Sequence, residues 1–354
     1  MRIDRDLRAA SWPEQKPVES VEFESGDVLM VCGGFEDRAM AVLDMAVTSR
    51  CSDLTVLNFE YAPSVESNHF QQVRNICEDA GWKHIRVQYD RCNPSGIFDN
   101  VARQLPSNVR RLFIDISGMS RLLIVQLIAG LMQQKKYISA VSILYTEAAS
   151  YPPTEAEARE KLASRAQDPS AIFSFISVGV YDLAIVPELS SSNLNRTPTR
   201  LIAFPSFNPA QLFSVKSIIQ PAKTTLIHGV PPDPALSWRT NVISQLNLIN
   251  DDDDQSISIS TLEYSECLNT LLALYEEWSE FNSLVLSPTG SKMQTVAVGI
   301  FRGFVRDIQI IYPTPLHFTD PTDHTHGAKQ VYELNLDSFV DLQNTFLASA
   351  ETAQ

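Results

Sequence analysis

The stretch 112–121 constrains the possible folds of this chain more than any other part of its sequence. It reads LFIDISGMSR, a short apolar run that ends in a polar turn containing a glycine, and no charged residue occurs in the following segment 122–132. The run has the length of a buried strand, and the segment after it that of a buried helix. The turn therefore places a carboxylate, a hydroxyl and backbone N–H groups at the carboxyl end of a strand, where open α/β sheets bind their ligands.

A similar stretch, LVLSPTGSKM, occupies 284–293 and aligns with 112–121 without a gap. The offset is 172 residues (284 minus 112). The matched pairs are Ser117 with Thr289, Gly118 with Gly290 and, one place apart, Arg121 with Lys292. One such turn is a weak signal, whereas two at matching places in a repeat are a much stronger one.

Strand and helix patterns alternate along the first half of the chain. The expected strands are 27–32, 54–59, 85–87, the central run and 140–145. One expected helix follows the first strand and ends near residue 48, and two others span 67–80 and 96–105. Alternation at this spacing predicts a largely parallel sheet with helices on both faces.

The second half repeats this plan. Segment 29–35 aligns with 201–207, position 54 with 226, and positions 85 and 87 with 257 and 259, all at the same offset, while 143–145 aligns with 310–312 at an offset of 167. A final pair, 180–183 and 331–334, predicts one more strand closing each half. The sequence therefore predicts an α/β protein with two tandem Rossmann-like, doubly wound, mostly parallel sheets related by internal duplication.

The predicted domain boundaries follow from these patterns. Residues 1–26 are polar and contain prolines, which predicts a lead-in with little structure. Residues 27–190 form the first predicted Rossmann-like domain and 199–345 the second, with a stretch rich in serine, asparagine and proline between them. Segment 153–167 is rich in glutamate and alanine and is expected to be an inserted helix.

Composition restricts the classes of function. The chain has 354 residues, a formal net charge of −14 and 44% hydrophobic residues, so it can bury globular cores, and its acidity argues against extended nucleic-acid binding. It has no apolar run of about 18 residues, and its N-terminus lacks the apolar core of a signal peptide. Its five cysteines are scattered and never in C-x-x-C spacing. We therefore expect a cytoplasmic protein without a membrane span and with reduced thiols.

The two central turns are the best candidate sites. The hydroxyls of Ser117 and Thr289 would donate hydrogen bonds to a ligand, and Arg121 and Lys292 would pair with its phosphates. Asp115 would accept a hydrogen bond from a ribose hydroxyl. The alternative interpretation is that both turns are structural, with the serine and the threonine capping the helices.

The two central turns are not expected to be equivalent. Arg121 follows Ser117 by four residues, whereas Lys292 follows Thr289 by three. On a helix these positions differ by about 100° in direction. Pro288 adds to the asymmetry, since it removes a backbone N–H from the second turn.

The first turn of each half is expected to border the same crevice as the central turn. Glycines after the first strand allow close approach of the backbone, and 206–208 is the copy of that turn; a plain glycine turn into a helix is the alternative. The predicted ligand-binding residues are Gly33, Gly34, Phe35, Asp115, Ser117, Gly118, Arg121, Ser206, Asn208, Thr289, Gly290, Ser291 and Lys292.

The remaining polar clusters favour no further site. The loop 320–326, DPTDHTH, contains metal-ligand types without the spacing of a known metal site, so a polar loop is the preferred interpretation. Residues 251–254 form an acidic run that is expected to be solvated, and Cys32 has no neighbouring histidine in the sequence to activate it. Dinucleotide, Walker and G-x-S-x-G motifs are absent. We expect no metal and no cofactor, and we assign no catalytic residue.

The spacing Asp115-x-Ser117-x-x-x-Arg121 resembles the motif that follows the fourth strand in CRISPR-associated Rossmann-fold (CARF) domains. The segment 289–292, TGSK, is similar to a second version of that turn, although Ser287 replaces the usual acid or amide. The resemblance covers the Rossmann core of each half. It implies binding of cyclic oligoadenylates or related second messengers, with Ser117, Arg121, Thr289 and Lys292 contacting phosphate and ribose.

Three functions are compatible with these observations. The leading hypothesis is a sensor or regulatory protein of a prokaryotic defence or stress system that binds a small anionic nucleotide and signals to a protein effector. The second is an enzyme that acts on a nucleotide between the two lobes, as a ring nuclease, hydrolase or transferase. The third is a scaffold subunit of a defence complex, whose acidic surface would suit basic partners.

Overall fold

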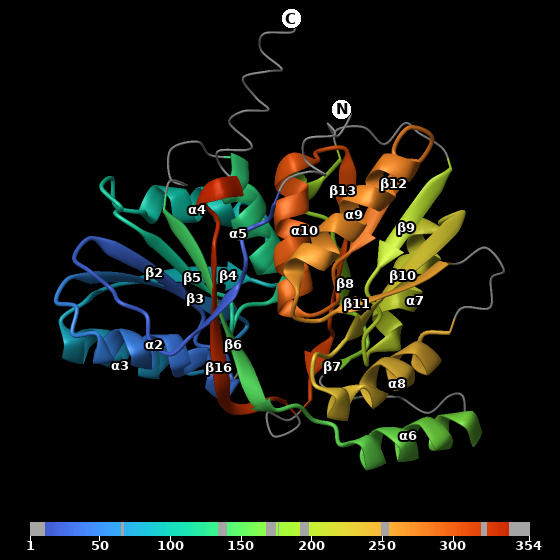
Figure 1. Cartoon of the computed structure of the whole chain (residues 1–354), viewed down its shortest axis with the longest axis horizontal. Helices are drawn as coiled ribbons and strands as arrows, with labels where there is room; N and C mark the ends of the chain where they lie inside the picture. Colours follow the sequence, from blue (N-terminus) through green and yellow to red (C-terminus); the bar gives the residue numbers. More distant parts are fainter. Residues whose placement is uncertain are drawn as a thin grey trace, which may run out of the picture. The chain divides into compact units, whose positions relative to one another are not determined.

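The computed structural model describes residues 11–64, 67–133, 140–167, 175, 177–191, 198–248, 255–319 and 324–339. The chain forms two compact units, drawn in Figure 1. The first unit consists of Ser11–Ser150 together with Thr325–Gln354, and the second is formed by Tyr151–His324. Among the described helices, none combines the length and the apolar composition needed to cross a membrane.

The first unit is built on a seven-stranded sheet with the strand order β1-β16-β6-β5-β2-β3-β4. Its strands are β1 (Lys16–Val18), β2 (Asp27–Val31), β3 (Leu54–Ala62), β4 (Lys83–Asp90), β5 (Leu112–Asp115), β6 (Val141–Ser150) and β16 (His326–Asn335). Strands β2 to β6 are parallel, whereas β16 runs antiparallel to both β6 and β1.

Helices cover both faces of this sheet (Figure 1). They are η1 (Asp37–Met40), α2 (Ala41–Thr48), α3 (Phe70–Ala80), α4 (Ile97–Gln104) and α5 (Arg121–Gln133). Helices α2 and α3 pack together on one face, and α4 and α5 pack together on the other. This is the doubly wound arrangement that the alternation of strands and helices predicts.

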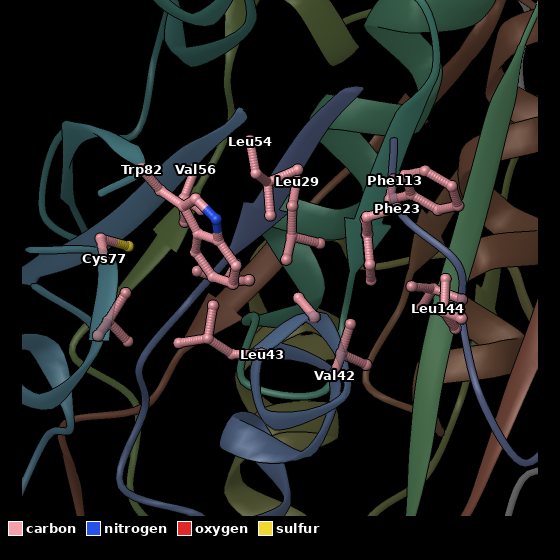
Figure 2. Packing of buried hydrophobic residues seen from close by; sticks show 14 of the residues in the cluster. Phe23, Leu29, Val42, Leu43, Leu54, Val56, Cys77, Trp82, Phe113 and Leu144 are labelled. Carbon is pink, nitrogen blue, oxygen red and sulfur yellow. The ribbon is translucent and has the colours of Figure 1, made fainter. Parts of the chain in front are cut away.

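Figure 2 shows the apolar layer between the sheet and helix α2. Leu29 of β2 is fully buried, and Val42 and Leu43 of α2 pack in the same cluster. Phe113 of β5 meets Phe23 edge-on, with 4.8 Å between ring centroids. Burial of each such side chain contributes about 1.5–3 kcal/mol, so the cluster fixes the position of β2 at the centre of the five parallel strands.

The second unit contains a five-stranded parallel sheet with the order β11-β10-β9-β12-β13. Its strands are β9 (Thr199–Ala203), β10 (Lys223–Val230), β11 (Gln255–Ser260), β12 (Ser283–Ser287) and β13 (Ile308–Ile310). The helices between them are α7 (Pro209–Ile219), η3 (Pro234–Leu236), α8 (Trp238–Leu246), α9 (Tyr264–Trp278) and α10 (Lys292–Phe304). When only the parallel strands are counted, in chain order, the first strand of each sheet lies between the second and the fourth. The predicted α/β fold class is confirmed.

The rest of the second unit consists of short elements and one longer helix. Two antiparallel pairs join β7 (Ser177–Val178) to β15 (His317–Phe318) and β8 (Asp182–Ala184) to β14 (Tyr312–Thr314). The 3₁₀ helix η2 spans Pro187–Leu189, and the predicted inserted helix is present as α6 (Glu155–Gln167).

Three of the five strand pairs keep the predicted offsets. Met30 of β2 pairs with Ile114 of β5. The residues 172 positions after these two, Ile202 of β9 and Leu286 of β12, pair in the second sheet. The last strand of each parallel set pairs with the fourth at the predicted offset of 167 (310 minus 143). The central turns therefore occupy the same place in both sheets.

The second and third strands depart from the predicted alignment. Val31 pairs with Asn58, whereas Ala203 pairs with Leu226, so the offset at the second strand is 168 (226 minus 58) and not 172. At the third strand, Asn58 pairs with Arg86 and Leu226 pairs with Ser256, so the offset there is 170 (256 minus 86). The ungapped alignment of these two strands was therefore wrong, because the connecting segments differ in length. Internal duplication stays a prediction.

The compact units divide at 150/151 and 324/325, not near the predicted boundary at 190–199. The reason is main-chain pairing: β16, from the end of the chain, joins β6 of the first sheet, with Tyr332 opposite Tyr145. The predicted closing strand at 180–183 overlaps β8, which pairs with β14 outside the five-stranded sheet. The lead-in also has structure, since β1 pairs with β16 and Val21 is buried.

The packing of α5 against α4 generates a test of the core. A Cβ atom on Gly130 would lie 2.2 Å from Cγ of the Phe98 ring. Replacing glycine by alanine inside a helix ordinarily stabilises by up to about 1 kcal/mol, but overlap with a buried ring costs about 1–3 kcal/mol. We therefore expect Gly130→Ala to lower the free energy of unfolding by about 1–2 kcal/mol in denaturant titrations. In a Phe98→Leu background the loss should shrink; an equal loss in both backgrounds would contradict the contact.

Candidate functional site

The polar turns lie at the point where the strand order reverses in each sheet. Strand β2 leads through α2 to β3 on one side, and β5 leads through α5 to β6 on the other. Turn 32–36 and turn 116–120 therefore leave adjacent strands toward opposite faces, as do turns 204–208 and 288–291 in the second unit. Doubly wound sheets bind ligands at such switch points.

The two turns of the first unit touch through their backbones. A Cβ atom added to Gly118 would lie 1.9 Å from the carbonyl oxygen of Cys32, and one added to Gly34 would lie 3.2 Å from the carbonyl oxygen of Gly118. The amide of His69, just before α3, donates to the carbonyl of Gly33 at 3.0 Å. The structure thus brings together the predicted residues of both turns, and only glycine fits at position 118.

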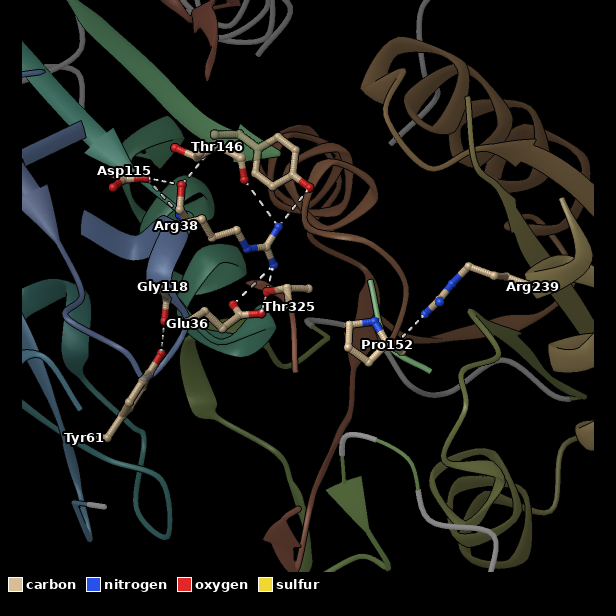
Figure 3. A network of polar contacts seen from close by, with 11 residues as sticks. Glu36, Arg38, Tyr61, Asp115, Gly118, Thr146, Pro152, Arg239 and Thr325 are labelled. Atoms are coloured by element: carbon tan, nitrogen blue, oxygen red, sulfur yellow. Dashed lines mark hydrogen bonds and ion pairs between the residues drawn. The ribbon is translucent and has the colours of Figure 1, made fainter. Parts of the chain in front are cut away.

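Asp115, labelled in Figure 3, belongs to a buried polar network that also includes Ser117. The Asp115 carboxylate accepts hydrogen bonds from the Ser117 amide (2.9 Å) and from the Ser117 hydroxyl (2.5 Å). The same hydroxyl accepts from the amide of Thr146 on β6 at 2.8 Å. Both side chains are buried. The Ser117 hydroxyl therefore ties β5 to β6, and a contact between it and a ligand stays a prediction.

Arg38 extends this network to the turn after β2. Its guanidinium donates to the Thr146 carbonyl (3.3 Å) and to the Tyr145 hydroxyl (3.2 Å), and it forms an ion pair with Glu36 at 3.2 Å. The Thr325 hydroxyl donates to Glu36 from the far end of the chain. Arg38 is buried, and charged groups are buried only when they are paired and hydrogen-bonded. The network therefore fixes the first turn against β6 and β16.

Tyr61, at the end of β3, completes the first site and was not among the predicted residues. Its hydroxyl donates to the carbonyl of Gly118 at 3.2 Å and accepts from the amide of Ser120 at 2.5 Å. Burial of the phenol group, aided by the nearby Cys32 thiol, raises the pKa of Tyr61 above its usual value. The phenol is therefore neutral at physiological pH and can both donate and accept.

The second unit joins its two turns by a side-chain hydrogen bond. The Thr289 hydroxyl donates to the carbonyl of Phe204, and a Cβ atom on Gly290 would lie 3.0 Å from the Phe204 ring. Asn208 is buried and donates to the Ser177 hydroxyl (3.1 Å). The predicted hydroxyl and amide groups of this turn are therefore engaged within the unit.

Helix α10 begins with a reciprocal capping box. The Ser291 hydroxyl accepts from the amide of Gln294 at 3.1 Å, and the Gln294 side chain accepts from the amide of Ser291 at 2.9 Å. Arg121 and Lys292 are the first residues of α5 and α10, and both are half-buried. The expected 100° difference in direction is therefore wrong, because the extra residue lies in the turn before α5 and not in the helix.

Arg239 of α8 is a further buried cation that the sequence did not single out. Its guanidinium donates to the carbonyls of Tyr151 (2.7 Å), Pro152 (3.1 Å) and Pro153 (3.3 Å), as Figure 3 shows for Pro152. It also lies over the Phe207 ring, 4.7 Å from its centroid. Burial lowers the pKa of Arg239 to about 10, so it stays charged at neutral pH. Arg239 thereby supports the turn that contains Ser206 and Asn208.

The acidic run 251–254 lies outside the described residues, as does the part 320–323 of the loop 320–326. Within that loop, a ring nitrogen of His324 is 3.4 Å from the Thr319 hydroxyl. Within the described part of the chain, no group of three His, Cys, Asp or Glu side chains is placed to hold a metal ion.

No family model matches the chain, and no curated protein matches its sequence. Among solved structures, the chain is similar to a type III CRISPR defence DNA nuclease activated by cyclic oligoadenylate, with a TM-score of 0.46 and 9% sequence identity. The alignment covers 81% of this chain and 65% of that nuclease, so the chain spans about two thirds of its length. Similarity at this level carries no argument about the site.

The Ser117 network predicts a structural cost for removing one hydroxyl. Ser117→Ala takes a donor from Asp115 and an acceptor from the Thr146 amide, both buried, which should cost about 1–3 kcal/mol of unfolding free energy. Thr48→Ala removes an exposed hydroxyl of the same unit and should change stability by less than about 0.5 kcal/mol. Chemical denaturation of both variants checks this; equal stabilities would place the Ser117 hydroxyl outside the network.

The glycine contacts predict unequal effects of two similar substitutions. Gly118→Ala forces a methyl group against the Cys32 carbonyl, a backbone atom that cannot move alone, and should destabilise by about 1–3 kcal/mol. Gly34→Ala meets its neighbour at 3.2 Å, so a shift of a few tenths of an ångström suffices, and reduced freedom of the unfolded chain offsets the cost. Thermal melts should therefore show a large loss for the first variant and a small change for the second. The reverse order would contradict the packing.

Proposed function

We propose that this protein binds a nucleotide second messenger of the cyclic oligonucleotide type at the switch points of its sheets, as a sensor or regulatory component of a prokaryotic defence or stress system. The observation that carries the proposal is that one kind of turn occurs at the same place in both sheets. In both sheets a glycine-containing turn follows the fourth strand, and a cation is the first residue of the next helix.

The chemistry of the turns supports an anionic ligand. Helices α5 and α10 each have 13 residues and present their N-termini at the carboxyl ends of β5 and β12. The helix dipole and the first N–H groups favour negative charge there, and a neighbouring cation adds to the attraction. Arg121 can hold a phosphate through two parallel hydrogen bonds, whereas Lys292 offers a single charge.

The internal contacts suggest separate roles for the predicted residues. Asp115, Ser117 and Thr289 have backbone or side-chain partners inside their units, so we assign them the shaping of the turns. Arg121 and Lys292 would hold phosphate groups of the ligand. The glycines of the first turns would border the ligand, and a protein effector would read the bound state.

Calorimetric titration with a panel of cyclic di-, tri- and tetranucleotides tests the proposal. We expect saturable heat for at least one member of the panel. Heat no greater than that of buffer dilution for every member, with a protein that melts cooperatively, would contradict it. Chromatography of the nucleotide after incubation with the protein distinguishes binding alone from ring cleavage, because only an enzyme changes the ligand.

The two cations should not contribute equally. We expect Arg121→Ala to weaken binding by about 1.5–3 kcal/mol, the range for hydrogen bonds to charged groups, and Lys292→Ala to weaken it less. The N-terminal amides at Ser291 and Gln294 are already engaged in the α10 capping box, which leaves Lys292 with less support for an anion.

Arg103→Ala is the matched control for these titrations, since Arg103 is an exposed arginine in the last turn of α4 and belongs to neither turn. Its affinity should equal that of the unmodified protein. Equal losses in the two test variants would indicate a symmetric site, and unchanged affinity in both would remove these helix starts from the proposed site.

A further inference from the structure

The N-terminus of α5 receives an oxygen from a distant part of the first unit. Ser120 is the residue before the helix, and its hydroxyl accepts from the Leu123 amide at 3.4 Å. Its own amide donates to the hydroxyl of Tyr61 at 2.5 Å, and Tyr61 belongs to β3, which lies beyond β2 in the sheet. The same hydroxyl donates to the Gly118 carbonyl, so the Tyr61 phenol links the Gly118 carbonyl to the Ser120 amide.

The equivalent position in the second unit shows why this contact is unusual. There the amide of Ser291 is satisfied by Gln294, the third residue of its own helix. The third residue of α5 is Leu123, whose side chain contains no oxygen. A buried N–H requires a partner. The N-terminus of α5 is thus open to an oxygen from outside the helix, whereas that of α10 is closed by its own sequence.

We propose that the Tyr61 hydroxyl is an internal stand-in for a ligand oxygen, and that an anionic ligand must displace it from Ser120 to bind the first unit. The proposal rests on the function proposed above and names its regulation: Tyr61 is an autoinhibitory contact of that site. The ligand class is an anion that carries phosphate oxygens.

The strengths of the competing hydrogen bonds make this displacement favourable. Hydrogen bonds to a charged phosphate oxygen are roughly twice as strong as those between neutral groups. Burial raises the pKa of Tyr61, so its hydroxyl is neutral and the weaker acceptor. Arg121, the next residue after Ser120, supplies a positive charge for the phosphate and none for a neutral phenol.

The Tyr61 ring is partly exposed and contacts two other aromatic rings. The residue is half-buried, and its ring meets that of Tyr89 edge-on at 5.8 Å and that of Phe70 at a tilt at 6.4 Å between centroids. Gly118 cannot move toward Cys32, because their backbones are already in contact. Movement of the turn toward Cys32 is therefore excluded, and the proposed displacement moves the Tyr61 side chain.

An autoinhibitory contact and a supporting contact predict opposite signs for one substitution. If Tyr61 competes with the ligand, Tyr61→Phe removes the competitor, and the apparent affinity rises because more of the protein is competent to bind. If Tyr61 only supports the turn, the same substitution leaves the Ser120 amide without its partner, loosens the turn and weakens binding. The sign of the change in affinity therefore decides between the two.

The experiment compares Tyr61→Phe with Tyr89→Phe in titrations with the cyclic nucleotide panel. Tyr89 is the matched control, because its hydroxyl donates to Gln126 on the same helix at 2.9 Å and not to the helix start. We expect the dissociation constant to fall about three- to tenfold for Tyr61→Phe, which corresponds to the loss of one neutral hydrogen bond. Tyr89→Phe should stay within about twofold of the unmodified protein.

Each outcome has a separate meaning. Binding by the unmodified protein with equal or weaker binding by Tyr61→Phe overturns the autoinhibitory contact and leaves the proposed function intact. Binding by none of the proteins overturns both. Binding by Tyr61→Phe alone supports both, since it means that the contact closes the site completely.

A second pair of measurements divides these requirements, because the first needs no ligand and the second needs no variant. Amide hydrogen exchange at Ser120 in the ligand-free protein should be faster in Tyr61→Phe than in Tyr89→Phe; equal protection would overturn the contact itself. In the unmodified protein with ring-labelled tyrosine, the Tyr61 resonance should shift when ligand saturates the site. A saturated site with an unmoved Tyr61 resonance would overturn the displacement.

Discussion

The contact between Gly118 and the carbonyl of Cys32 is the constraint on which the first site depends. Because no side chain fits between these two backbones, the turn after β5 is pressed against the turn after β2. This places Ser117 where its hydroxyl can bridge Asp115 and the Thr146 amide, and it places Thr146 where Arg38 can reach its carbonyl. The carboxyl ends of β2, β5 and β6 are thereby joined by polar contacts in the interior of the unit.

The sequence predicted the fold class and most of the strands because buried parallel strands and their helices are encoded by local apolar runs. It failed where the partner of a strand is far away. Strand β16 has a mixed pattern of exposed and buried residues, so nothing in segment 326–335 says that it pairs with β6 and β1. The alignment of the second strands failed for a related reason: apolar residues matched by chance at an offset of 172, and only the pairing of Val31 with Asn58 reveals the true register.

The sequence predicted which turns form the candidate site, but it did not predict which atoms of those turns face a ligand. A strand, a polar turn with glycine and an apolar helix identify the switch point from sequence. Whether a hydroxyl such as that of Ser117 faces a ligand or a neighbouring amide depends on what the fold brings beside it. Tyr61, Arg38 and Arg239 could not be singled out for the same reason, since each acts on a segment more than fifty residues away in the chain.

The position of β16 has a consequence for how the protein is made. The ribosome finishes β6 at residue 150 and then synthesises all of Tyr151–His324 before the strand that pairs with the free edge of β6 emerges. At about 5–20 residues per second, that edge waits on the order of ten to thirty seconds, during which its unpaired N–H and C=O groups can pair with other chains. The nascent first unit is therefore an incomplete sheet until β16 has been synthesised. A truncation near the C-terminus would damage the unit that was synthesised first.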